Sequence, residues 1–170
     1  MDLIHKAHVG FVYVYECFDT NGKLKWRDRE ENIIPDVGRD YILTAALLAG
    51  SQLPNWYIGL YENVRTPLVG DTMTTLMADC GEVTTYTSAG SLRLALVPDA
   101  LSSGVFSNLS TPAEFVFTAA KTIKGGFISS SAAWGATSGT LLSAVQNSSP
   151  KAVGIGETLR VTAGLSLTTV

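Results

Sequence analysis

Histidines, cysteines and carboxylates are the side chains that could do chemistry in this chain, and the first two are few. The two histidines, His5 and His8, stand three residues apart with Asp2 nearby, a spacing that could suit a metal ion. Structural zinc normally takes four ligands, and Cys17 and Cys80 are remote from each other in sequence, so we expect no metal site. A Ser-His-Asp triad would have to draw its base from this same N-terminal segment, and no Gly-x-Ser-x-Gly turn supplies a nucleophile.

Three carboxylates, Asp71, Asp79 and Glu82, lie near one another in the chain and could form a catalytic pair. Glycoside hydrolysis needs two carboxyl groups about 5 to 9 Å apart in a cleft. Capping of a short helix by Asp71 and a turn at Asp79-Cys80-Gly81 explain these residues without chemistry. Gly154-Ile155-Gly156 lacks the third glycine of a dinucleotide-binding loop. We therefore expect no cofactor, and we expect that the protein is not an enzyme.

Aromatic side chains offer a different kind of site, because exposed rings can form a platform for sugars. The candidates for such a platform are Trp56, Tyr57, Tyr61 and Trp134. Trp56 and Tyr57 are neighbours in a predicted strand and point to opposite faces, so at least one of them is expected in the core. A carbohydrate-binding or receptor-binding module stays open as an alternative.

The composition argues against several classes of partner. Of the 170 residues 46% are hydrophobic and 16% are charged, and the net charge is −3. Without clustered Lys and Arg we expect no binding to nucleic acid, and without a run of about 20 apolar residues we expect no membrane span. Polar residues occupy the Met1–Val9 segment where a signal peptide needs apolar ones, which predicts that the protein is made and kept in a cytosol. A surface this poor in charge favours contact with other proteins.

Alternating apolar and polar residues predict a mostly β protein. Val9–Cys17 and Lys23–Arg27 read as a hairpin joined by Asp19-Thr20-Asn21-Gly22, and the charged run Asp28–Glu31 is expected to be solvated. The clearest alternation, Leu159–Leu167, predicts a half-buried strand near the end of the sequence. Further candidate strands lie in Asn55–Tyr61, Phe115–Phe117, Thr122–Ser129 and Thr140–Val145. The expected fold is an antiparallel, jelly-roll-like β-sandwich, with residues 1–8 as an N-terminal arm and residues 9–170 as a single domain.

One helix is predicted near residues 37–49. Pro35 and Asp36 open it, with Asp36 as the capping residue, and Gly50 closes it. Its apolar positions fall on more than one side and are Val37, Tyr41, Ile42, Ala45, Ala46, Leu48 and Ala49. We expect such a helix to be widely buried, either across a sheet or between a sheet and a neighbouring subunit.

Five short segments follow one another in a recognisable order. They are Val37–Leu43, Asn55–Asn63, Asp71-Thr72-Met73, Gly81-Glu82 and Gly156–Thr162, and they extend over roughly residues 33 to 167. This order resembles a group of small tailed-bacteriophage structural proteins encoded among head and tail genes. The chain departs from that pattern at Ala78–Glu82, where a His-x-Gly-Trp-x-Glu stretch is expected, so no role tied to that His and Trp is carried over.

The resemblance implies a virion component, by preference a decoration or cement protein that binds the capsid surface and is made in the cytoplasm of the bacterial host. Its expected partners are the major capsid protein and other copies of itself, in a homodimer or homotrimer around a local symmetry axis. A tail tube or adaptor subunit is the alternative within the virion. Extended arms and exposed aromatic rings are common tools of such contacts, and the candidate arms are Met1–His8 and Ser88–Leu109. The candidate interaction residues are Met1, Asp2, Leu3, Ile4, His5, Trp56 and Trp134.

Overall fold

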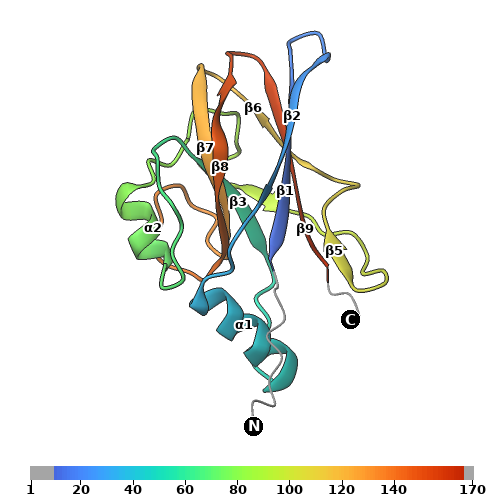
Figure 1. Cartoon of the computed structure of the whole chain (residues 1–170), viewed down its shortest axis with the longest axis vertical. Helices are drawn as coiled ribbons and strands as arrows, with labels where there is room; N and C mark the ends of the chain where they lie inside the picture. Colours follow the sequence, from blue (N-terminus) through green and yellow to red (C-terminus); the bar gives the residue numbers. More distant parts are fainter. Residues whose placement is uncertain (1–9, 167–170) are drawn as a thin grey trace.

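Two antiparallel sheets packed face to face make up the body of the protein (Figure 1). The computed structural model describes residues 10–166. One sheet has the order β2-β1-β9-β5, with β6 also paired to β9, and the other has the order β4-β3-β7-β8. The strands are β1 (Phe11–Phe18), β2 (Leu24–Glu31), β3 (Trp56–Tyr61), β4 (Leu94–Leu96), β5 (Val105–Ser107), β6 (Ala113–Val116), β7 (Lys121–Ser129), β8 (Leu141–Val153) and β9 (Thr158–Ser166). The predicted antiparallel β-sandwich is confirmed.

The strand pair β1 and β9 forms the centre of the larger sheet, and its alternation was visible in the sequence. Every second residue of β1 from Phe11 to Cys17 is buried, while the residues between them are half-buried. In β9 the alternate residues Leu159, Val161 and Ala163 are buried in the same way. Tyr15 of β1 pairs with Val161 of β9 in the ladder between the two strands. The predicted inward faces of both strands are thus confirmed over the described residues.

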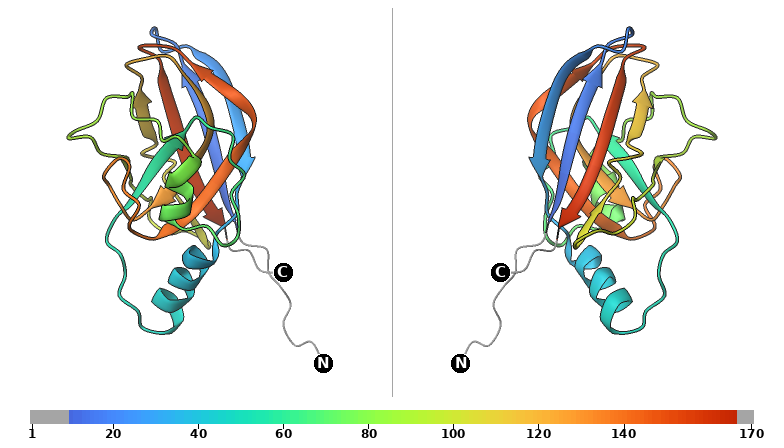
Figure 2. Two further views of the ribbon diagram at one scale, coloured as in Figure 1. Left: turned by 90° about the vertical axis from the view of Figure 1, so that its left-hand side faces the viewer. Right: turned by 90° about the vertical axis from the view of Figure 1, so that its right-hand side faces the viewer.

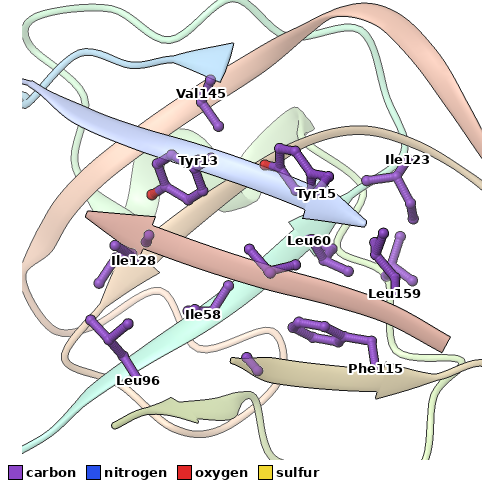
Figure 3. Packing of buried hydrophobic residues seen from close by; sticks show 14 of the residues in the cluster. Tyr13, Tyr15, Ile58, Leu60, Leu96, Phe115, Ile123, Ile128, Val145 and Leu159 are labelled. Carbon is purple, nitrogen blue, oxygen red and sulfur yellow. The ribbon is translucent and has the colours of Figure 1, made fainter. Parts of the chain in front are cut away.

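The core fills the space between the two sheets (Figure 3). Tyr13 and Tyr15 from β1 face Ile58 and Leu60 from β3, and all four are fully buried. Burial of a side chain of this size stabilises the fold by about 1.5 to 3 kcal/mol. The core therefore depends on strands that are far apart in the sequence.

The two sheets are also joined along one side, between the edge strands β2 and β8. Three alternate residues of β2 bond to β8. The Trp26 indole N–H donates to the carbonyl of Ala152, Asp28 pairs with Lys151, and Glu30 accepts from the backbone N–H and hydroxyl of Ser148. The prediction of a solvated run at residues 28–31 is confirmed for Arg29 and Glu31, which are exposed and pair with each other, and is wrong for Asp28 and Glu30, which bond to β8.

The helix α1 (Asp36–Leu47) lies where it was predicted, but its ends differ from expectation. Pro35 precedes the first turn and gives no side-chain cap, and Asp36 instead pairs with Arg39. At the other end Ala49 adopts a left-handed conformation with φ 54°, which lets the Gly50 N–H reach the Thr44 carbonyl. Glycine normally takes the position that Ala49 occupies.

The expected wide burial of this helix is not found within the chain. α1 projects beyond one end of the sandwich (Figure 2), and Gly38 is its one buried residue. The side chains of Leu43, Leu47 and Leu48 are 52%, 73% and 74% exposed. Apolar side chains this open to solvent are typical of a contact surface.

A second helix, α2 (Met73–Asp79), covers the outer side of the smaller sheet. Its capping residue is Thr72, which exchanges hydrogen bonds with Thr75 in a capping box. The predicted cap, Asp71, lies one residue earlier and bonds elsewhere. Met73 and Leu76 bury the inner side of α2 in a small second core with Phe127 of β7.

Candidate interaction surface

The carboxylates Asp71 and Asp79, which could have served an enzyme, are both bound by one arginine. The Arg65 guanidinium donates two hydrogen bonds to Asp71, at 2.6 and 2.7 Å, and one to Asp79, at 2.9 Å. Asp71 also accepts from the Leu68 backbone N–H and the Thr75 hydroxyl. Burial disfavours the charged form of Asp71, but these donors outweigh it and hold the pKa of its carboxyl below the ordinary value. A general acid needs the opposite shift.

The third carboxylate, Glu82, forms an ion pair in the interior. Its two oxygens accept hydrogen bonds from Arg93 at 2.6 and 3.0 Å, and Glu82 also accepts from the Gly135 backbone N–H. The Arg93 side chain has no exposed surface and lies over the ring of Phe127. Hydrogen bonds from this pair to Ser131 and Gly135 connect the segment before β4 with the β7–β8 loop, so the role of Glu82 is structural.

Neither a reactive cysteine nor a metal-binding cluster is found in the part of the chain that the structure describes. Burial raises the pKa of Cys17 to about 11 and that of Cys80 to about 12, and nearby carboxylates add to both shifts. Thiolates are scarce at neutral pH when the pKa is this high. Within residues 10–166 no group of three or more His, Cys, Asp or Glu side chains could hold a metal ion. His5 and His8 lie outside this range.

An apolar groove opens at the end of the sandwich from which α1 projects. It is a cavity of about 550 Å³ lined by side chains from both sheets and from α1, among them Phe11, Ile42, Trp56, Phe106 and Leu142. Its remaining wall is the turn before β5, at residues 101–104. Cavities that bind small molecules or peptide side chains have similar volumes and mostly apolar walls.

Exposed apolar side chains continue from this groove onto both of its flanks. On one flank is the α1 face, which we define as Leu43, Leu47 and Leu48, and on the other are Leu101 and Val105. Residues 41–61, from the second turn of α1 to the end of β3, contain no Asp, Glu, Lys or Arg. Monomeric proteins rarely expose apolar surface of this continuity, so this end of the molecule has the properties of a protein-binding surface.

The opposite end of the sandwich is polar by comparison. A hollow of about 720 Å³ lies there, lined by Lys25, Lys121 and Lys124 together with Glu62 and backbone of the β8–β9 turn. Lys25 pairs with Glu157 and Lys121 pairs with Glu62. These pairs neutralise much of the positive charge, and the hollow is a poor candidate for binding anions.

The predicted interaction residues fall in three places. Trp56 lines the apolar groove and packs edge-on against Tyr41 at 5.1 Å between ring centres. Trp134 lies in the β7–β8 loop, donates its indole N–H to the Tyr86 hydroxyl at 2.7 Å and packs against the main core, away from the groove lining. The structure does not bring these two rings into one hollow. The predicted residues Met1–His5 belong to the N-terminal segment, which lies outside the described residues.

The α1 face was not among the predicted interaction residues, whereas the turn at residues 101–105 falls within the predicted arm Ser88–Leu109, whose strands β4 and β5 belong to this chain's own sheets. A signal for the α1 face was present, because the helix has apolar residues on more than one side and residues 41–61 carry no charge. Within the predicted arm Ser88–Leu109, no sequence signal singles out this turn. Leu101 and Val105 become part of the surface only because β5 pairs with the end of β9 beside the groove.

Two further observations bear on the identity of the protein. No helix among residues 10–166 is long and apolar enough to cross a bilayer. Comparison of the chain with protein-family models, with curated proteins and with solved structures finds no significant match.

Proposed function

We propose that this chain is a non-enzymatic structural protein of a tailed-phage virion that binds the capsid exterior and stabilises it, as decoration or cement proteins do. Its partners are the major capsid protein and other copies of itself. The observation that carries the proposal is the exposed apolar surface at the α1 end of the sandwich, formed by the α1 face and, across the groove, by Leu101 and Val105. The order of sequence segments that resembles phage structural proteins supports the same role.

The energetics of the α1 face favour a partner that makes several contacts at once. The exposed parts of Leu43, Leu47 and Leu48 together equal about two fully exposed leucine side chains, and their burial is worth about 3 to 6 kcal/mol. Association costs roughly 4 to 15 kcal/mol, so this face alone does not hold two molecules together. A protein that touches several neighbours on a lattice gains from each contact after the first without paying that cost again.

A catalytic role has less support. The three carboxylates that could have formed a pair are bound by Arg65 and Arg93, and the pKa of Asp71 lies in the direction that an acid catalyst avoids. A sugar platform made of Trp56 and Trp134 is not assembled, because Trp134 uses its polar atom on Tyr86 and packs on the core.

The role of the α1 face can be tested with exposed leucines that lie at opposite ends of the sandwich. The test variant is Leu43→Gln with Leu47→Gln, and the control is Leu24→Gln, since Leu24 is exposed in β2 at the far end. Glutamine is nearly as good a helix former as leucine, so α1 keeps its stability. Purified variants are added to phage particles that lack the protein, and bound copies are counted by quantitative electrophoresis.

We expect the double variant to lose most of its binding and the Leu24→Gln control to bind like the original chain. Equal binding of both variants would show that α1 is not the contact. A chain that never binds particles, and that is absent from particles made in infected cells, would exclude the virion role altogether.

A further inference from the structure

The apolar groove opens at the point where the chain enters the sandwich. Phe11, the first residue of β1, forms part of the groove wall, and Gly10 is the residue that precedes it. We propose that the N-terminal segment, residues 1–9 of the same chain, binds in this groove and fills it with the side chains of Leu3 and Ile4. This inference concerns the isolated chain and does not depend on the virion role.

The length of the segment suits the groove. An extended chain spans at most about 3.3 to 3.6 Å per residue, so nine residues reach about 30 Å from their fixed end. Ile4 is seven residues before Phe11 and can lie anywhere within about 24 Å of it. Since Phe11 is itself in the wall, the segment starts at its binding site and has enough length to double back along it.

The chemistry of the segment also matches. Its apolar residues are Met1, Leu3, Ile4, Ala7 and Val9. The groove presents rings and aliphatic side chains such as Ile42 and Trp56. Its polar groups are the hydroxyls of Ser102 and Ser103 in the turn and that of Tyr41, which accepts from the Leu53 backbone N–H. Apolar side chains that fill such a groove are removed from water on both sides of the contact, which is the main favourable term in docking of this kind.

Two other occupants fit less well. Residues 167–170 follow β9, whose Leu165 also lines the groove, and they supply two apolar side chains, Leu167 and Val170, against five in residues 1–9. The N-terminal segment of a second copy has the right chemistry, yet it must first be brought together with the groove. A segment attached to the groove wall is present at an effective concentration in the millimolar range, so binding within one chain wins at ordinary protein concentrations.

The test uses a thiol placed in the groove wall. Ser102 lies in the exposed turn beside the groove, and only its backbone bonds to Val105, so Ser102→Cys leaves those bonds in place. The two natural thiols, Cys17 and Cys80, are buried and have a raised pKa, and they give a low background with a thiol reagent. The labelling rate of the new thiol therefore reports whether the groove is covered.

Three full-length variants are compared in the Ser102→Cys background. The test variant carries Leu3→Asp and Ile4→Asp, the matched control carries His5→Asp and His8→Asp, and a third carries Leu167→Asp and Val170→Asp. We expect about tenfold faster labelling in the test variant only, which corresponds to a covered state favoured by about 1.4 kcal/mol. Protection in the parent should not change when the protein is diluted.

Each other outcome overturns the proposal. Faster labelling of the third variant alone would assign the groove to the C-terminal residues. Protection that disappears on dilution would assign it to a second copy. Equal labelling rates in all variants would mean that the groove is open. If labelling is faster in the test variant and also in the His5→Asp, His8→Asp control, the cause is the added charge and not the loss of the apolar side chains.

Discussion

Replacement of Glu82 by glutamine should strongly destabilise the protein, because it leaves the Arg93 guanidinium buried without a counter-charge. Glu82 gives Arg93 two charged acceptors, at 2.6 and 3.0 Å, and the Arg93 side chain has no exposed surface. The acceptors that would remain, including the carbonyl of Ser131 at 2.9 Å, are neutral. Removal of one partner from a buried pair costs about 3 to 5 kcal/mol, which is a large part of the roughly 5 to 15 kcal/mol that stabilises a domain.

Urea unfolding of four proteins measures this cost: the parent, Glu82→Gln, Arg93→Met, and the chain with both changes. We expect each single change to lower the free energy of unfolding by about 3 to 5 kcal/mol and the double change to cost clearly less than their sum. A control, Arg160→Met, breaks the half-exposed pair with Glu114 and should cost at most about 1 kcal/mol. A Glu82→Gln cost as small as that of the control would refute a structural role for the buried pair and reopen the question of why the carboxylate is there.

Three other changes probe the backbone, the core and the pH dependence. Ala49→Gly should raise the free energy of unfolding by up to about 1 kcal/mol, since Ala49 has a positive φ. Ala46→Gly, inside α1, should instead lower it by about 1 kcal/mol, and thermal unfolding of both variants shows whether the two effects have opposite signs. Gly59→Ala should lower the melting temperature, at a cost of about 1 to 3 kcal/mol, because the new methyl group would meet the Phe127 ring, and an unchanged melting temperature would contradict the packing. The pKa of Asp71 is lowered in the folded state, so its contribution to stability is complete above the unfolded value of about 3.9 and is lost as the pH falls through the folded value. The stability difference between the parent and Asp71→Asn should therefore be constant near neutral pH and shrink below about pH 4 in urea titrations, and a difference that grows there would be the opposite of what we expect.

The parts of the fold that could be predicted from sequence are those in which local pattern and burial agree. Alternation in β1 and β9 marks strands with one buried face, and the turn at residues 19–22 marks their hairpin neighbour β2. The full length of β2 could not be predicted, because Asp28 and Glu30 read as solvated until their partners are known. Those partners, Lys151 and Ser148, lie more than a hundred residues away in β8.

The candidate interaction surface, too, could be predicted only in part. Composition favoured a surface that contacts other proteins, and the helix predicted near residues 37–49 was visible as apolar on more than one side, but the sequence could not decide whether it lies across a sheet or against a neighbouring subunit. A helix with apolar residues on more than one side is either a core helix or an interface helix, and only the position of the sheets decides between them. The pairing of Arg65 and Arg93 with the three carboxylates could not be foreseen either, because it depends on loops that the fold brings together.

The most direct test of the proposed function is cryo-electron microscopy of phage particles that contain this chain. The account predicts density for the β-sandwich on the outside of the capsid in copies that follow the capsid symmetry, with the α1 face against a neighbouring molecule. A ring of copies at the tail would indicate a tail tube or adaptor subunit instead. Particles without the protein, or copies whose α1 face points into solvent, would contradict the account.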